Sequence, residues 1–186
     1  PITTAAKLVD EGYILAIKGL GGYHLAAKAT DDDVVLLLRR RKKRPSKPFA
    51  VMGLDTKVLN RIVIVDNDAE KLLRSPQVPI LLLPKRSDSP VSKYVSPGLS
   101  HEGVFIAYTG LHYLLLMNTS DKFLIMTSGN STGEPMCIDE KCAREKLSRI
   151  ADYFLVHDRE IVNRVDDSVL RRTDGEWVFL RRSRGY

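Results

Sequence analysis

The sequence predicts an α/β domain. Segments with helical periodicity alternate along the chain with short apolar segments typical of strands, which favours helices packed against a sheet. The chain has 186 residues, of which 44% are hydrophobic and 28% charged, so it has the composition and the length to bury a core. This length fits one domain or two tightly fused lobes, and the sequence contains no internal repeat and no low-complexity linker.

Capping and helix-stopping residues define the predicted helices. Gly12 ends the first helix, and Thr30 is a good N-cap for the second, whose first turn carries three Asp residues. The apolar residues 34–38 supply the buried face of this second helix, and Pro45 and Pro48 stop it after a run of basic residues. Further helices are predicted at residues 55–61, 68–74, 111–117 and 139–150, in addition to the first helix at residues 3–11.

Short apolar segments bounded by turn residues predict the strands. Asp174 and Gly175 form a typical hairpin turn in a strand-rich last third of the chain, and residues 87–98 carry the prolines and serines of a long surface loop. Strands are predicted at residues 13–18, 23–27, 49–52, 79–83, 103–107, 123–127 and 177–180.

Basic residues concentrate in segment 39–47, which holds seven Lys and Arg and no acid. The chain has a net charge of +6, but outside this segment 22 basic residues stand against 23 acidic ones. A uniformly basic nucleic-acid-binding surface is therefore disfavoured. Residues 39–41 are explained by the helix macrodipole, which favours basic side chains at a helix C-terminus. Residues 42–47 lie beyond the last apolar position and predict a binding strip for a polyanion such as a nucleoside triphosphate.

Two loops follow predicted strands. Segment 127–135 gathers hydroxyl and amide groups, which bind anions and, through Asn or Ser oxygens, Mg²⁺; an Asn-Gly-type surface turn is the alternative. The glycine-rich turn at residues 19–22 lacks the spacing of a dinucleotide-binding loop or a P-loop, so a tight turn between strands explains it better. Lys18 stands at the end of the strand before this turn, where side chains often reach a cleft.

Several classes of site and protein are disfavoured. The His residues are isolated from zinc-ligand partners, and Cys137 and Cys142 cannot form a disulfide framework, so a reducing cytoplasm is the expected environment. Ser128 is not a hydrolase nucleophile, because no G-x-S-x-G turn surrounds it. No apolar run reaches the about 20 residues of a membrane span. His157 with Asp158, and Asp166 with Asp167, are weaker candidates for acid–base, metal or substrate roles.

Four segments taken together resemble one family: residues 16–29, 41–52, 126–135 and 157–186. They are similar to the YrdC-like domain of the HypF carbamoyltransferases of [NiFe]-hydrogenase maturation. The resemblance implies a single twisted, mostly mixed open sheet with flanking helices and a concave basic cleft. Because the chain opens with Pro1 and lacks the other HypF modules, we expect residues 1–186 to be one domain excised from a longer multidomain protein.

The resemblance also assigns site residues. The family's KxR element falls on Lys42 and Arg44, which are expected to be catalytic by neutralising a triphosphate, and its SxN element falls on Ser128 and Asn130. The resemblance assigns no metal ligand in the protein, and Mg²⁺ is expected to arrive with ATP near Asn130. Ala107 and Gly110 replace prolines in the Tyr-Thr-Pro-Leu-His pattern, which weakens the roles of Thr109 and His112. Nucleotide contacts are expected from Lys42, Arg44, Lys47, Ser128, Asn130, Ser168 and Arg182, and substrate contacts from Lys18, Tyr23, His24, Thr109, His112 and Arg164.

The implied activity is ATP-dependent formation of carbamoyl-adenylate from carbamate derived from carbamoyl phosphate, a step in synthesis of the hydrogenase cyanide ligand. The implied partners are the remaining modules of the parent protein and its carbamoyl-acceptor maturation protein, with no membrane. A threonylcarbamoyl-adenylate synthase of tRNA modification is one alternative, although residues 18–22 lack the PTET-like segment of those enzymes. A double-stranded RNA-binding module is another, although the chain has little aromatic interleaving.

Overall fold

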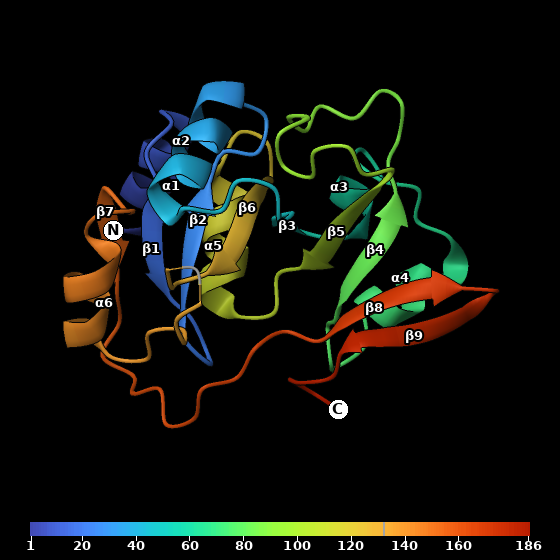
Figure 1. Cartoon of the computed structure of the whole chain (residues 1–186). Helices are drawn as coiled ribbons and strands as arrows, with labels where there is room; N and C mark the ends of the chain where they lie inside the picture. Colours follow the sequence, from blue (N-terminus) through green and yellow to red (C-terminus); the bar gives the residue numbers. More distant parts are fainter. Residues whose placement is uncertain (132) are drawn as a thin grey trace.

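The computed structural model describes residues 1–131 and 133–186. In this part of the chain nine strands form one sheet with the order β7-β1-β2-β6-β3-β5-β4-β8-β9 (Figure 1). The pairs β1–β7, β3–β5 and β4–β8 are parallel, and the other neighbours are antiparallel. The predicted α/β class and the mixed sheet with flanking helices are therefore confirmed, whereas a concave basic cleft stays a prediction.

The strands are short, as the sequence predicts, and most lie within a few residues of their predicted bounds. They are β1 (Leu15–Lys18), β2 (Tyr23–Ala27), β3 (Ala50–Gly53), β4 (Ile80–Pro84), β5 (His101–Ile106), β6 (Phe123–Ser128), β7 (Tyr153–Leu155), β8 (Val169–Thr173) and β9 (Glu176–Arg181). The helices are α1 (Ile2–Asp10), α2 (Asp32–Lys42), α3 (Thr56–Leu59), α4 (Asn67–Leu73), α5 (Gly110–Asn118) and α6 (Glu140–Leu147).

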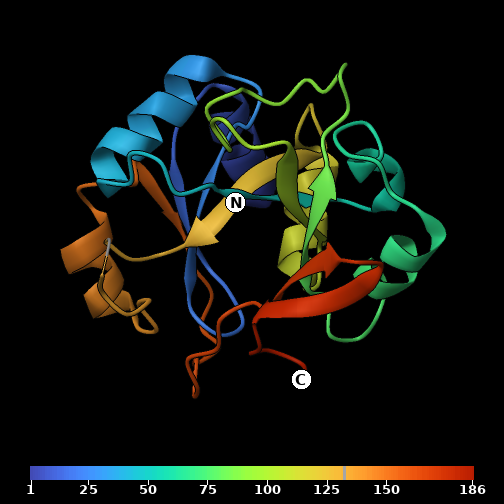
Figure 2. The same cartoon turned by 45° about the vertical axis from the view of Figure 1, so that its right-hand side comes forward.

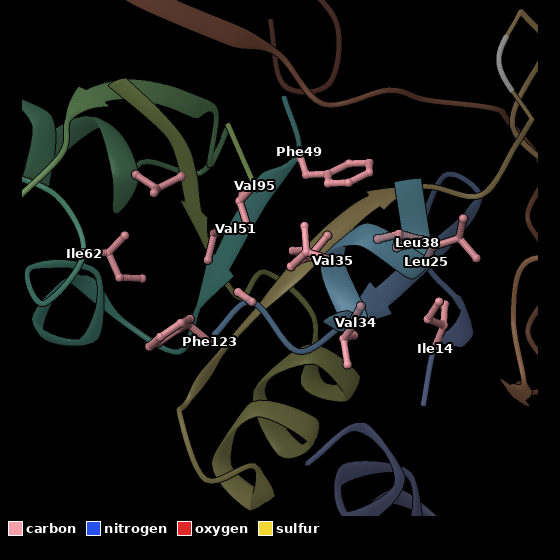
Figure 3. Close-up of a cluster of buried hydrophobic side chains, with 14 of the residues drawn as sticks. Ile14, Leu25, Val34, Val35, Leu38, Phe49, Val51, Ile62, Val95 and Phe123 are labelled. Carbon is pink, nitrogen blue, oxygen red and sulfur yellow. The ribbon is translucent and has the colours of Figure 1, made fainter. Parts of the chain in front are cut away.

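Helices cover both faces of the sheet, because successive strand residues point to opposite sides. In β6, Phe123 and Ile125 join a hydrophobic cluster with α2, α4 and α6, whereas Leu124 and Met126 join a second cluster with α1 and α5. Figure 3 shows part of the first cluster, in which Val35 of α2 lies over the sheet. No helix among the described residues is both long enough and apolar enough to span a membrane.

Helix α2 begins and ends differently from the prediction. Asp31, not Thr30, is its N-cap: the Asp31 carboxylate accepts from the backbone N–H groups of residues 33 and 34, while the Thr30 hydroxyl donates to Asp121. The helix ends before the prolines, because Lys43 already adopts a left-handed conformation with φ of 53°. Lys42 is thus the last helical residue, and it is buried with 2% exposure instead of lying beyond the buried face.

A long connection crosses the sheet after β7. Residues 156–168 lead from β7, at one edge, to β8, which lies next to the opposite edge (Figure 1). The hairpin of β8 and β9 then runs beside α4 in both views (Figures 1 and 2). An ion pair between Arg172 of β8 and Asp66, the N-cap of α4, joins these elements at 2.5 Å. The connection brings residues of the last third of the chain to the ends of β1 and β2.

Candidate functional site

Lys42 and the loop after β6 meet at the end of the sheet. Lys42 Nζ donates to Ser128 O at 2.7 Å, to Asn130 O at 2.6 Å and to Asn130 Oδ1 at 2.9 Å. Ser128 Oγ also donates to Asn130 Oδ1, at 2.7 Å. The structure therefore brings together the lysine of the predicted KxR element and both residues of the SxN element. Burial and the charges of Arg44 and Lys47 lower the pKa of Lys42 to about 7, whereas three oxygen acceptors favour its ammonium form.

Gly129 lets this loop lie directly against the start of β2. Its backbone N–H donates to Tyr23 O at 2.6 Å, and a Cβ atom at this position would lie 2.5 Å from the same oxygen. Gly129 O in turn accepts from the N–H of Cys137, whose own carbonyl accepts from the N–H of Tyr23. Both ends of the loop are thus fixed to one residue of β2, which keeps Ser128 and Asn130 beside Lys42.

The two cysteines pair, which the sequence does not predict. Cys137 and Cys142 form a disulfide that links the end of this loop to α6, with a Cα–Cα distance of 5.6 Å. The sequence correctly excludes a disulfide framework, but a spacing of five residues across the start of a helix gave no signal for a single bridge. The bridge adds a covalent constraint to the hydrogen bonds that hold the loop.

Further cations surround Lys42. Burial, followed by the charges of Arg39 and Arg181, lowers the pKa of Arg44 to about 10. Arg44 Nη2 donates to Pro48 O at 2.5 Å and Arg44 Nε to Lys47 O at 3.2 Å. The charges of Arg44 and Lys47 act on Lys42, and those of Arg39 and Arg181 act on Arg44, so several positive charges lie within electrostatic reach of one another. Such a cluster of like charges favours the binding of a polyanion.

A second group of polar side chains is buried between β2 and α5. His24 of β2 pairs in register with Ser128 of β6, so the two groups lie on neighbouring strands at the same level of the sheet. The ring of His24 lies 5.9 Å from that of His112 of α5, measured between centroids. The Tyr108 ring packs edge-on against His112 at 4.6 Å, again between centroids. The structure thus brings two of the predicted substrate residues together.

Two charged residues, Arg184 and Asp167, contact the aromatic rings of this group. Arg184 lies 3.9 Å from the centroid of the Tyr108 ring, and its Nη2 donates to Asp167 Oδ1 at 2.9 Å. Asp167 Oδ2 lies 3.9 Å from His24 Nε2. Asp167 was predicted only as a weaker candidate for a metal or substrate role, and neither Arg184 nor Tyr108 was predicted as a site residue. They come from distant parts of the chain, and only the crossing connection brings them together.

The imidazoles in this group are held neutral. Burial, with smaller effects of His24 and Arg184, lowers the pKa of His112 to about 3, and burial also lowers the pKa of His24. Both ring nitrogens of His112, Nδ1 of His24 and the hydroxyl of Tyr23 are buried without a hydrogen-bond partner in the described structure. A buried polar atom without a hydrogen-bond partner costs free energy of folding. Such atoms are expected at a site where a ligand supplies the missing hydrogen bonds.

Lys18 and Thr109 line a pocket of about 250 Å³ next to this group. Lys18 ends β1, and its ammonium donates to His157 O at 2.9 Å. The hydroxyl of Thr109 accepts from the N–H of His112 as the N-cap of α5. Thr109 therefore orients the helix that carries His112, and residues 157–160 complete the pocket wall.

Three predicted residues have other contacts. The Ser168 hydroxyl donates to Arg184 O and accepts from the N–H of Ser183, so it holds the C-terminal segment. Arg164 donates to Met136 O, behind the loop that ends at Cys137. Arg182 is exposed near Phe179, with 5.9 Å between its guanidinium carbon and the ring centroid, whereas the adjacent Arg181 is the one whose charge acts on Arg44. Adjacent residues of a strand point to opposite faces of the sheet. The sequence alone did not show which of Arg181 and Arg182 faces the site.

The described residues do not form a cluster of His, Cys, Asp or Glu metal ligands. Among the described residues, no group of three or more His, Cys, Asp or Glu is arranged to hold a metal ion. Asn130 Oδ1 already accepts from Lys42 and Ser128, so this oxygen does not fit a direct Mg²⁺ ligand.

Comparisons with known proteins agree with this architecture. The Sua5/YciO/YrdC family model, described as "Telomere recombination", matches residues 7–183. The carbamoyltransferase HypF of Rhodobacter capsulatus is 50% identical over 184 residues, which are 99% of this chain and 24% of that protein. The chain therefore spans about a quarter of the length of this relative.

Solved structures show the same relation. The crystal structure of full-length HypF in the phosphate- and nucleotide-bound form has a TM-score of 0.95 and 46% identity, covering 100% of this chain and 29% of that one. The structure of P. abyssi Sua5 complexed with L-threonine has a TM-score of 0.85 at 22% identity, over 98% of this chain and 54% of that one, and shows a shared fold. The predicted resemblance to the YrdC-like domain of HypF is thus confirmed, and the chain belongs to the Sua5/YciO/YrdC family.

Proposed function

We propose that this chain binds ATP and joins it to carbamate, derived from carbamoyl phosphate, to form carbamoyl-adenylate and pyrophosphate. The observation that carries the proposal is the contact of Lys42 with Ser128 and Asn130 inside a cluster of cations. The HypF relative is a carbamoyltransferase, and a similar HypF structure is in a phosphate- and nucleotide-bound form. The domain would supply one step of carbamoyl transfer within a longer polypeptide, with an acceptor maturation protein as its partner.

The chemistry requires little of the protein beyond positioning and charge. A carbamate oxygen attacks the α-phosphorus, the new O–P bond forms, and the bond from this phosphorus to the bridging oxygen breaks to release pyrophosphate. Lys42, Arg44 and Lys47 stabilise the charge on the leaving pyrophosphate. Because the substrate supplies the nucleophile, no side-chain nucleophile is needed. ATP brings Mg²⁺, which shields phosphate charge when bound.

The buried histidines suit the carbamate end of this reaction. Carbamate decomposes to ammonia and carbon dioxide when it is protonated, so its binding site must not donate protons to it. Neutral His24 and His112 offer hydrogen bonds without an acidic proton, because burial lowers the pKa of each. Because His24 pairs in register with Ser128, a nucleotide held by the SxN loop would have its α-phosphate close to this group.

Calorimetric titration of the chain with ATP and Mg²⁺ tests the site. Lys42→Met and Asn130→Ala should each weaken ATP binding at least tenfold, since each removes part of the Lys42–Asn130 contact. Lys57→Met removes an exposed lysine of α3 and serves as the charge-matched control, with affinity within twofold of the wild type. Wild-type affinity in both site variants would refute the assignment.

Release of pyrophosphate tests the reaction. We expect release that depends on carbamate supplied from carbamoyl phosphate or bicarbonate with ammonia. Release that requires threonine instead would identify a threonylcarbamoyl-adenylate synthase. Binding of double-stranded RNA that weakens steeply with salt, without ATP binding, would favour an RNA-binding module.

A further inference from the structure

Arg39 connects two loops through backbone carbonyl groups only. Its guanidinium is buried, with 6% of the residue exposed. Nε donates to Tyr94 O at 2.7 Å and Nη2 to Val95 O at 3.0 Å. Nη1 faces the other loop and donates to Arg44 O at 2.8 Å, to Lys47 O at 3.1 Å and, more weakly, to Pro45 O at 3.4 Å. All three guanidinium nitrogens are thus occupied within the protein, so Arg39 is not available to a ligand.

The loop that Arg39 holds has little structure of its own. Among the described residues, 45–48 form no backbone–backbone hydrogen bond, and two of these four residues are prolines. Three of the four loop carbonyls instead accept from arginine: those of Pro45 and Lys47 from Arg39, and those of Lys47 and Pro48 from Arg44. Phe49 supports both arginines, because its ring centroid lies 4.5 Å from the guanidinium carbon of Arg39 and 5.1 Å from that of Arg44.

The opposite loop is fixed independently. Ser96 Oγ donates to Glu102 Oε2 at 2.8 Å, and the N–H of Phe49 donates to Val95 O. Figure 3 shows Val95 close to Phe49, which directly precedes β3. Glu102 is also the acid whose charge favours the protonated form of Arg39. The loop around residues 94–96 is therefore a fixed support, to which Arg39 ties the loop that carries Arg44 and Lys47.

We propose that Arg39 is a positioning residue, which holds residues 44–47 so that Arg44 and Lys47 are oriented for a polyanionic ligand. This inference rests on the proposed function for the identity of that ligand, ATP. Lysine cannot replace Arg39, because an ammonium group donates from one point whereas the planar guanidinium reaches carbonyls of two loops at once. Arg39 thus acts on the nucleotide only through the loop.

The first experiment compares Arg39→Lys with Arg40→Lys, a matched change at the exposed neighbouring position of α2. Hydrogen exchange of the ligand-free chain should be at least tenfold faster at the amides of Arg44 and Phe49, which donate to Arg39 O and Val95 O, in Arg39→Lys only. Calorimetry should show at least a tenfold loss of ATP affinity in the same variant. Unchanged exchange in a folded Arg39→Lys chain, or ATP affinity within twofold of the wild type, would overturn the proposal.

A double-mutant cycle separates positioning from general destabilisation. If Arg39 acts through Arg44 and Lys47, Arg39→Lys should change ATP affinity by less than threefold in a chain that already carries Arg44→Met and Lys47→Met. An equally large loss in that background would overturn the proposal. If Arg39→Lys fails to fold, Phe49→Leu keeps the arginine and removes its aromatic support; it should give the same two effects to a smaller extent, and wild-type behaviour would count against the proposal. If the wild type does not bind ATP, the proposed function fails, while hydrogen exchange still tests the role of Arg39 in the loop.

Discussion

Lys42 Nζ lies 2.9 Å from Asn130 Oδ1, although the two residues are 88 positions apart in the sequence. The contact joins the C-terminal end of α2 to the loop after β6. Because Lys42 also binds the carbonyls of Ser128 and Asn130, a ligand meets a lysine whose orientation is already set. Such preorganisation lowers the entropic cost of binding.

ATP binding should be coupled to proton uptake. The folded-state pKa of Lys42 is about 7, below its ordinary value. At pH 8 Lys42 is therefore neutral in most molecules of the ligand-free protein. A bound polyanion favours the ammonium form, so binding at pH 8 should take up close to one proton. Calorimetry in two buffers with different ionisation enthalpies measures this uptake. Equal uptake by the wild type and Lys42→Met would contradict the prediction.

Gly129→Ala should disrupt the loop after β6. The added Cβ would lie 2.5 Å from Tyr23 O and 2.8 Å from the Tyr23 carbonyl carbon, which are backbone atoms with little freedom to move. We expect a loss of at least about 2 kcal/mol in the free energy of unfolding, together with weaker ATP binding. Gly110→Ala is the matched control, because its Cβ would meet no atom within 4 Å. Denaturant unfolding of the two variants provides the comparison.

Acid should destabilise the fold through His112. Its folded-state pKa is about 3, so as the pH falls below about 6.5 only the unfolded chain gains a proton at this residue. The free energy of unfolding should fall by about 2 kcal/mol between pH 7 and pH 5 from this residue alone. His112→Leu should lack this part of the pH dependence, whereas His101→Gln should keep it. Urea unfolding at pH 7 and pH 5 measures these changes. An equal change in the free energy of unfolding for His112→Leu and the wild type would show that His112 is not responsible.

Reduction should loosen the link between α6 and the loop after β6. The Cys137–Cys142 bridge closes a short segment, with a sequence separation of 5, so its loss should cost about 2 kcal/mol of stability. Unfolding curves with and without dithiothreitol measure the difference. Cys142→Ser should resemble the reduced wild type and show no response to the reductant. A wild type that does not respond either would mean that the bridge contributes nothing to stability.

Hydrophobic patterning was sufficient to predict most of the fold. The strand at Tyr23–Ala27 matches its predicted bounds, and Phe123–Ser128 extends the prediction by one residue, because both consist mostly of buried apolar side chains. The short strand β7 was not predicted, since three residues give too little periodicity to be distinguished from a loop. Its strand conformation depends on pairing with β1.

The site was harder to predict than the fold. The family resemblance identified Lys42 and Asn130, but charge patterning placed Lys42 outside the buried face and assigned Arg39 to the helix dipole. Both are buried because carbonyl oxygens surround their charged groups, and a sequence does not show where such carbonyls gather. The same limit explains why Arg184 gave no signal: its partners are distant residues and a ring face.

The connection over residues 156–168 has a consequence for how the chain unfolds. It ties β7, at one edge of the sheet, to β8, next to the opposite edge, and on its way Val165 N–H donates to Gly21 O. Because this connection joins both ends of the sheet, we expect fraying at one edge to disturb the strands at the other. The protein should therefore melt as a single cooperative unit, in spite of its width.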